Sequence, residues 1–290
     1  MVKAVLDFSG SRVLVTGGTA GIGRGIADAF LERGARVIVC GRKDPGDMPT
    51  KGGRKLEFRK CDVREASECN ALVSGIARDH GGLDVLVNNA GGSPEVDSAT
   101  CSPTLIEKVI QLNLTAAFFM SQAAYAVMKD QPEGGSIINI SSVSAVRSSP
   151  RTAAYGAAKA GLLNLTESLA MEWGPQGIRV NALIVGLVAT GNSLEHYGGV
   201  EGVKRVGAML PLQRMGTPQD VADGCLYLAS PLSAYVSGAK IEVHGGGEKP
   251  VFVDVAKIAR DDGTSGRAAR LDANPRAAYH RPSHSGESHK

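Results

Sequence analysis

The sequence is poor in aromatic residues and contains no long apolar run. Aromatic residues make up only 4% of the 290 residues, whereas glycine occurs 37 times. This composition favours tight turns and close backbone approaches over a β-sandwich. No apolar run reaches the ~18 residues of a membrane-spanning helix, and the first residues lack the basic-then-apolar order of a signal peptide. We therefore expect a cytoplasmic protein with no membrane partner.

Neither sign of charge dominates, and the cysteines form no recognisable pattern. The 32 basic and 29 acidic residues are interspersed and leave a net charge of +3. This balance argues against a nucleic-acid groove or a membrane-binding face. The five cysteines are odd in number and widely spaced, which predicts free, mostly buried thiols in a reducing compartment and no metal site: Cys40, Cys61, Cys69, Cys101 and Cys225.

A short strand near the N-terminus runs directly into a glycine-rich turn. Residues Arg12–Thr16 are apolar and β-branched without alternation, as is typical of a strand buried on both faces of a parallel sheet. A helical pattern follows the turn and ends at Gly34. The free N–H groups of such a turn and the positive end of the helix dipole favour a pyrophosphate. We therefore predict a dinucleotide site at Gly17, Thr19, Gly21, Ile22 and Gly23.

The end of the second strand indicates which dinucleotide fits. Enzymes that use NAD usually place a carboxylate there to bind the ribose 2′-hydroxyl. The strand at residues 35–40 instead leads to Arg42 and Lys43, with no carboxylate before Asp44. A guanidinium can pair with a 2′-phosphate, so the sequence favours NADP over NAD.

Apolar strands and amphipathic helices alternate along the rest of the chain. Further strands are predicted at residues 56–61, 83–87, 136–140, 177–183 and 240–243, and helices at residues 65–80, 104–128, 153–169 and 221–229. This alternation predicts an α/β fold, a doubly wound parallel sheet (Rossmann fold) in a single domain, with about seven strands and helices on both faces. The domain should span residues 1–248. Residues 249–290 are largely polar and read as a flexible extension, although residues 251–258 could pack somewhere.

Polar residues follow several of these strands at their carboxyl ends. Asp62 could accept a hydrogen bond from an adenine amino group, and the amides of Asn88 and Asn89 could bridge strand ends and line the cofactor cleft. The segment 187–216 carries six glycines and weak periodicity. We interpret it as a mobile segment that covers substrate, with an ordinary long loop as the alternative.

The stretch from Asn139 to Lys159 carries the candidate chemistry. Tyr155 and Lys159 are four residues apart, so on a helix they share one face. An ammonium beside the phenol should lower the Tyr155 pKa towards neutrality, where proton transfer is most useful. Ser142 could hydrogen-bond the oxygen that receives the proton. A Tyr-x-x-x-Lys pair also occurs by chance in many helices, so its interpretation depends on the nucleotide site upstream.

Seven motifs stand in a fixed order between residue 10 and about residue 248: Thr16-Gly17-x-x-x-Gly21-Ile22-Gly23, Asp62-Val63, Asn88-Asn89-Ala90-Gly91, Asn113, Ser142, Tyr155-x-x-x-Lys159 and Arg179-Val180-Asn181. In these motifs the chain resembles the short-chain dehydrogenase/reductase family, and within it the single-domain reductases such as 3-oxoacyl-carrier-protein reductase. The resemblance implies a homotetramer, or at least a homodimer, built on the Tyr155 helix and its neighbour.

The resemblance also implies a role for each matched residue. Tyr155 would be the general acid/base, and Lys159 would bind the nicotinamide ribose and lower the Tyr155 pKa. Ser142 would polarise the substrate carbonyl, and Asn113 would distort its helix and hold a water. Further cofactor contacts would come from Arg42, Asp62, Val63, Asn89, Ala90, Gly91, Gly186, Val188 and Thr190. One departure is Val185, which replaces the family's proline and removes a fixed φ beside the nicotinamide.

The resulting prediction is an oxidoreductase that transfers a hydride between NADP(H) and a carbonyl or secondary-alcohol substrate. One alternative is an NAD-dependent alcohol dehydrogenase. Another is a dinucleotide-binding sensor without turnover, although such proteins often lose the tyrosine or lysine that this chain retains. An apolar substrate pocket could be formed by Leu194, Tyr197, Met209 and Leu210. These residues do not identify the substrate.

Overall fold

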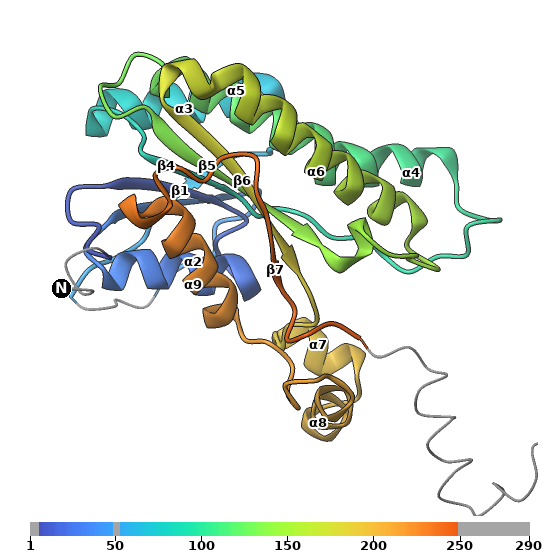
Figure 1. Cartoon of the computed structure of the whole chain (residues 1–290). Coiled ribbons are helices and arrows are strands. Elements are labelled where there is room, and N and C mark those ends of the chain that lie inside the picture. Colours follow the sequence, from blue (N-terminus) through green and yellow to red (C-terminus); the bar gives the residue numbers. More distant parts are fainter. Residues whose placement is uncertain (1–5, 49–52, 249–290) are drawn as a thin grey trace, which may run out of the picture. The chain divides into compact units, whose positions relative to one another are not determined.

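The computed structural model describes residues 6–48 and 53–248, and these form a seven-stranded parallel sheet between two layers of helices (Figure 1). The strand order is β3-β2-β1-β4-β5-β6-β7, so the direction of winding reverses between β1 and β4. The strands are β1 (Arg12–Thr16), β2 (Arg36–Gly41), β3 (Glu57–Lys60), β4 (Val85–Asn88), β5 (Gly135–Ser142), β6 (Ile178–Val185) and β7 (Lys240–Val243). The predicted doubly wound fold is confirmed. The predicted extension from residue 249 lies outside the described residues.

Helices cover the sheet on both faces because each central strand is apolar on both sides. Helices α2 (Gly21–Glu32) and α9 (Pro218–Ala229) pack against alternate residues of the strands in one buried core. On the opposite face α3 (Ala66–His80), α5 (Ala116–Met128) and α6 (Ala153–Trp173) close a second core. The two faces together bury the central strands, which explains their unbroken apolar runs.

The predicted helix at residues 104–128 is interrupted. Helix α4 spans Pro103–Ile110, and a π-helical turn at Gln111–Thr115 separates it from α5. Asn113 lies in this turn, so the distortion expected around it is present. Strand boundaries also differ from the predictions by one or two residues, and Ser141 and Ser142 belong to β5 itself.

The segment 187–216 is not an ordinary long loop, which was the alternative interpretation, and its role in covering substrate stays a prediction. Two short helices occupy it, α7 (Gly191–His196) and α8 (Val200–Met209). Two of the glycines in this segment allow close packing of the backbone. A Cβ at Gly202 would lie 1.6 Å from the Tyr197 carbonyl oxygen, and a Cβ at Gly207 would lie 3.0 Å from Arg214 Cα. Side chains at these two positions would force the backbones apart, so α8 needs glycine there.

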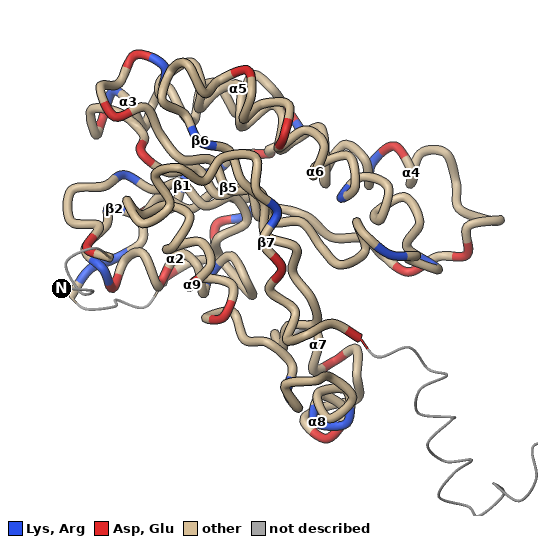
Figure 2. Tube along the Cα trace, viewed as in Figure 1, with Lys and Arg blue, Asp and Glu red and all other residues tan. Residues whose placement is uncertain are grey.

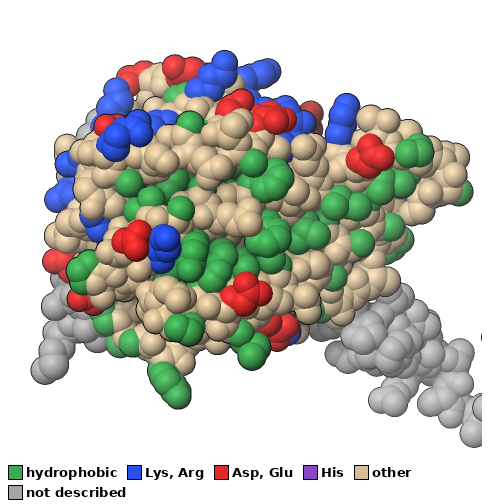
Figure 3. Space-filling model, turned by 90° about the horizontal axis from the view of Figure 1, so that it is seen from above, with side chains coloured by type: hydrophobic (Ala, Val, Ile, Leu, Met, Phe, Trp, Pro, Cys, Tyr) green, Lys and Arg blue, Asp and Glu red, His purple; other side chains and the backbone are tan. Residues whose placement is uncertain are grey.

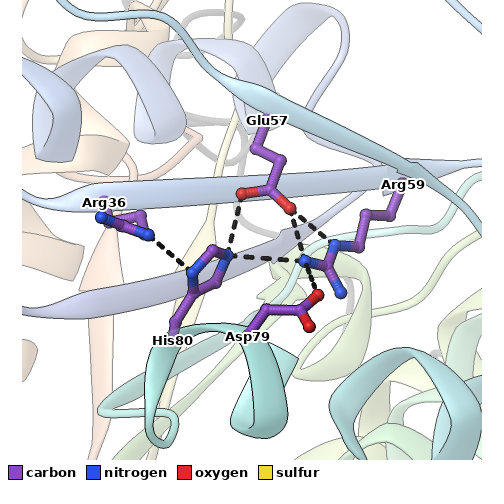
Figure 4. Close-up of polar contacts among 5 residues, drawn as sticks. All are labelled: Arg36, Glu57, Arg59, Asp79 and His80. Atoms are coloured by element: carbon purple, nitrogen blue, oxygen red, sulfur yellow. Dashed lines mark hydrogen bonds and ion pairs between the residues drawn. The ribbon is translucent and has the colours of Figure 1, made fainter. Parts of the chain in front are cut away.

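The edge strand β3 is held by a cluster of charged side chains (Figure 4). Arg59 Nη2 donates to Asp79 at 2.7 Å, and Glu57 accepts from Arg59 Nε at 2.7 Å and pairs with His80 Nε2 at 2.9 Å. Arg36 Nη1 lies 2.6 Å from His80 Nδ1. The cluster ties β3 to β2 and to the end of α3. Charged side chains on an edge strand also discourage pairing with another chain.

Elsewhere, acidic and basic residues are interspersed along the described chain (Figure 2). No helix among residues 6–48 and 53–248 is long and apolar enough to cross a membrane. The five cysteines are free, and four of them are buried, as predicted.

Candidate active site

The site begins where the winding of the sheet reverses, between β1 and β4. The Thr16 Oγ1 atom accepts hydrogen bonds from the backbone N–H groups of Asn89 and Ala90, both at 2.9 Å. The Asn89 amide donates to the Thr16 carbonyl at 2.9 Å, and the Asn88 amide donates to Asn139 Oδ1 at 2.9 Å. The predicted bridging of strand ends by these amides is confirmed. The bridges hold open a crevice at the carboxyl ends of the strands, where dinucleotides bind in this type of fold.

Glycines shape the floor of this crevice. Gly17 has φ +63°, a backbone conformation that favours glycine. A Cβ at Gly23 would lie 2.4 Å from both the Gly17 carbonyl oxygen and the Asn89 amide nitrogen. Helix α2 starts at Gly21, and its N-cap Ala20 makes no side-chain capping bond. The first N–H groups of the helix are therefore not capped by that side chain, and the residues fit a pyrophosphate.

A cavity of about 440 Å³ extends from this cradle to the Tyr155 helix. Twelve of the predicted residues line it: Gly17, Gly21, Ile22, Gly23, Asn89, Ala90, Gly91, Ser142, Tyr155, Lys159, Gly186 and Thr190. Thr19, Arg42, Asp62, Val63, Asn113 and Val188 do not. Six lining residues are not among the predicted site residues: Ala20, Gly92, Ile140, Ser141, Val185 and Gly191. Each directly adjoins a predicted lining residue or another of the six, and this adjacency was the available signal.

Lys159 is buried at the base of the cavity, with only 3% of its surface exposed. Its Nζ donates to the Ile140 carbonyl at 2.8 Å, and the Ser141 hydroxyl donates to the Lys159 carbonyl at 3.1 Å. Consecutive residues of β5 thus hold both ends of this residue. Burial disfavours the ammonium and lowers the pKa of Lys159 to about 8.

Tyr155 lies beside Lys159 on the same helix face, with Lys159 Nζ 5.6 Å from the centre of the Tyr155 ring. The prediction of a lowered Tyr155 pKa was wrong for this structure. Burial raises the pKa of Tyr155, and a side-chain hydrogen bond with Ser142 opposes that effect. The predicted proximity of the ammonium to the Tyr155 ring is present, but Lys159 Nζ donates its hydrogen bond to the Ile140 carbonyl.

Asn113 sits behind the cavity wall and is 1% exposed. Its amide nitrogen donates to the carbonyls of Gly92 at 2.8 Å and Val109 at 2.9 Å, and its Oδ1 accepts from the Gly92 N–H at 2.9 Å. The side chain therefore fixes the loop after β4. A Cβ at Gly91 would lie 2.6 Å from Asn113 Oδ1 and 3.2 Å from Lys159 Nζ, so only glycine fits between them.

The end of β2 lies apart from the cavity. Arg42 is exposed, and it contributes to lowering the pKa of Asp62. The main cause of that lowering is Arg64, whose Nε donates to Asp62 Oδ1 at 2.9 Å. The carboxylate assigned to adenine is thus already paired within the chain. Val63 is 7% exposed in the core.

The segment after β6 approaches the cavity from the other side. Val188 forms an isolated bridge with Gly216, and the Thr190 N–H donates to Ser193 Oγ at 2.7 Å at the start of α7. Leu210, one of the four residues proposed for an apolar pocket, is 4% exposed, whereas Leu194 and Met209 are 39% and 64% exposed. Among the described residues, no group of three or more histidine, cysteine or acidic residues could hold a metal ion.

Comparison with known proteins identifies a matching family and several relatives of this chain. The family model described as enoyl-(acyl carrier protein) reductase matches residues 17–248. A 3alpha-hydroxysteroid dehydrogenase of Mediterraneibacter gnavus is 35% identical over 239 residues, which cover 80% of this chain and 94% of that protein. An L-rhamnose 1-dehydrogenase (NAD(P)(+)) of Azotobacter vinelandii is 36% identical over 244 residues, covering 81% and 95%. The ligand-free aldohexose dehydrogenase of Thermoplasma acidophilum has a similar structure, with a TM-score of 0.77, 31% identity and coverage of 83% and 95%.

Proposed function

The chain belongs to the short-chain dehydrogenase/reductase family, and on that premise we propose that it transfers a hydride between NADP(H) and a carbonyl or secondary-alcohol substrate. One observation carries the proposal. Ser142, Tyr155 and Lys159 line the same cavity as the glycine cradle of β1 and α2. A bound nicotinamide dinucleotide would supply or accept the hydride. The residues that would hold it are those of the cradle, Asn89 to Gly91, Gly186 and Thr190.

Proton transfer, polarisation of the carbonyl and binding of the ribose are assigned to different residues. The raised pKa of Tyr155 keeps the phenol protonated at neutral pH, so it enters a reduction as the proton donor. Ser142, hydrogen-bonded to Tyr155, polarises the substrate carbonyl. Lys159 binds the nicotinamide ribose, and as its ammonium it stabilises the phenolate that remains after proton transfer. Asn113 acts by holding the loop that carries Gly91 and Gly92.

We assign NADP as the cofactor from the end of β2. The described residues there offer no carboxylate for a ribose 2′-hydroxyl before Asp44, and Arg42 is exposed. Because Asp62 is paired with Arg64, Arg42 is available to bind a 2′-phosphate. Preference for NADH over NADPH in binding and turnover would instead identify an NAD-dependent alcohol dehydrogenase.

We also propose a cytoplasmic homotetramer or homodimer. Seen from above, hydrophobic side chains gather over the helices α4, α5 and α6 (Figure 3). Exposed apolar residues occur on all three: Ile106 at 36%, Phe118 at 38% and Met171 at 83%. A face of this kind suits a partner with the same face.

The test of the proposed function is a panel of carbonyls and alcohols read by NADPH absorbance beside NADH. The related proteins are named for steroid and sugar substrates, so cyclic ketones, sugar lactols and short keto compounds belong in the panel. We expect NADPH-dependent reduction of at least one class. NADPH binding without turnover of any compound would favour a sensor.

A further inference from the structure

A second, smaller cavity adjoins the catalytic one. Its volume is about 130 Å³, and it shares Gly186 with the cavity that holds Tyr155 and Lys159. Val143, the residue after Ser142, forms part of its wall. The site therefore lies beside the proposed reacting carbonyl. Because it is well below the ~300–1,000 Å³ of cavities that enclose whole ligands, it fits a substituent of a substrate and not a ring system.

The lining of this small cavity combines an apolar wall with three ionisable side chains. Its members are Val143, Val146, Arg147, Gly186, Leu187, Leu210, His244, Gly247 and Glu248. Arg147 Nη2 donates to Glu248 Oε1 at 2.5 Å. His244 is 20% exposed and its Nε2 lies 2.7 Å from Glu242 Oε2. Burial raises the pKa of Tyr197, the charges of Glu248 and Glu95 raise it further, and the charge of Arg147 opposes them.

The backbone fixes these groups where three strands end. Arg147 follows β5, Gly186 follows β6 and His244 follows β7. The Gly186 N–H donates to the Val243 carbonyl at 3.0 Å, and a Cβ at Gly186 would lie 2.6 Å from His244 Cβ. The Leu212 N–H donates to the Gly245 carbonyl at 3.2 Å, which ties the segment after β7 to the segment after α8 (Figure 1). These contacts fix the backbone of Gly186 and His244 at one side of the cavity.

We propose that this cavity binds a carboxylate of the substrate, which replaces Glu248 at Arg147. The Glu248 carboxylate already shows that the guanidinium donates to a carboxylate here. The two side chains are 45% and 36% exposed, and ion pairs at such positions are weak because water screens them, so one carboxylate can exchange for another at little cost. An arginine can also bind a carboxylate through two parallel N–H groups. The enzyme then acts on keto acids or hydroxy acids. This inference rests on the proposed function.

The experiment compares a short γ-keto acid with its neutral methyl ester. For each, kcat/KM with NADPH is measured in the wild type, Arg147→Ala, Glu248→Gln and the control Lys204→Ala, which removes an exposed charge from α8. Because ion pairs at partly exposed positions are weak, Arg147→Ala should lower the acid-to-ester ratio by about two- to fivefold. Glu248→Gln should raise the ratio, and Lys204→Ala should leave it unchanged.

A binding measurement separates this inference from the proposed function. Titration calorimetry with the acid and with the ester, in the presence and absence of NADPH, measures binding to the cavity even if neither compound is reduced. Tighter binding of the acid that is lost in Arg147→Ala supports the carboxylate site. Equal binding of acid and ester, or acid binding unaffected by Arg147→Ala, would overturn it. Failure of every carbonyl in the panel to oxidise NADPH would count against the proposed function alone.

Discussion

The buried ammonium of Lys159 should make the stability of the protein depend on pH in a defined window. Burial lowers the pKa of Lys159 from 10.5 to about 8. This corresponds to about 3 kcal/mol, since a tenfold change in proton affinity is worth ~1.4 kcal/mol. Below about pH 8 the folded and unfolded states are both protonated, and the folded state bears the cost of the buried charge. Between about pH 8 and 10.5 the unfolded state binds more protons, so stability rises with pH.

Lys159→Met removes this charge from the core. At neutral pH the variant should gain about 3 kcal/mol, less the ~1–2 kcal/mol lost when the Ile140 carbonyl loses its hydrogen bond. The variant should therefore be slightly more stable than the wild type near pH 7. It should be less stable above about pH 10.5, where only the lost hydrogen bond remains. Turnover should fall steeply because the ribose contact is gone.

The assay is urea-induced unfolding followed by the fluorescence of the single tryptophan, Trp173, at several pH values between about 7 and 10.5. The difference in unfolding free energy between wild type and variant should change by about 3 kcal/mol across the window. Lys204→Met, which removes an exposed lysine, is the matched control. A difference that stays constant with pH, or an equal change in the control, would refute the argument from burial.

Three further predictions concern the cofactor, the loop after β4 and assembly. Arg42→Ala should weaken NADPH binding by about tenfold while leaving NADH binding nearly unchanged, as measured by cofactor fluorescence; equal losses would contradict the 2′-phosphate contact. Gly91→Ala should reduce kcat and lower stability by ~1–3 kcal/mol in thermal unfolding, because its Cβ meets Asn113 and Lys159. Met171→Glu should shift the protein towards smaller species in sedimentation analysis, and an unchanged mass would exclude this face as the interface.

Local chemistry explains what the sequence could predict. Gly17 to Gly23 supplies free backbone N–H groups at a helix start, and Tyr155 and Lys159 share a helix face through their spacing alone. The cradle and the pair could therefore be predicted from the sequence. The start of α9 is also a local signal, because Thr217 precedes Pro218 and its Oγ1 accepts from the Asp220 N–H at 3.3 Å.

Features that depend on contacts between distant segments could not be predicted from the sequence. Helix α8 contains two glycines that pack against Tyr197 and Arg214, and no local pattern distinguishes them from loop glycines. The Lys159 ammonium was expected beside the Tyr155 oxygen, but its partner is a carbonyl on β5, nineteen residues earlier in the chain. The raised pKa of Tyr155 depends on burial, which follows only from the assembled fold.

The central claim is that Tyr155 exchanges the proton while the cradle holds the cofactor independently. Its most direct test is Tyr155→Phe, assayed for NADPH-dependent reduction of a substrate found in the panel and for NADPH binding by fluorescence. Removal of a general acid typically costs ~10²–10⁴-fold in turnover, and we expect a loss in that range with cofactor affinity nearly unchanged. A Tyr155→Phe enzyme with near-normal turnover would contradict the account.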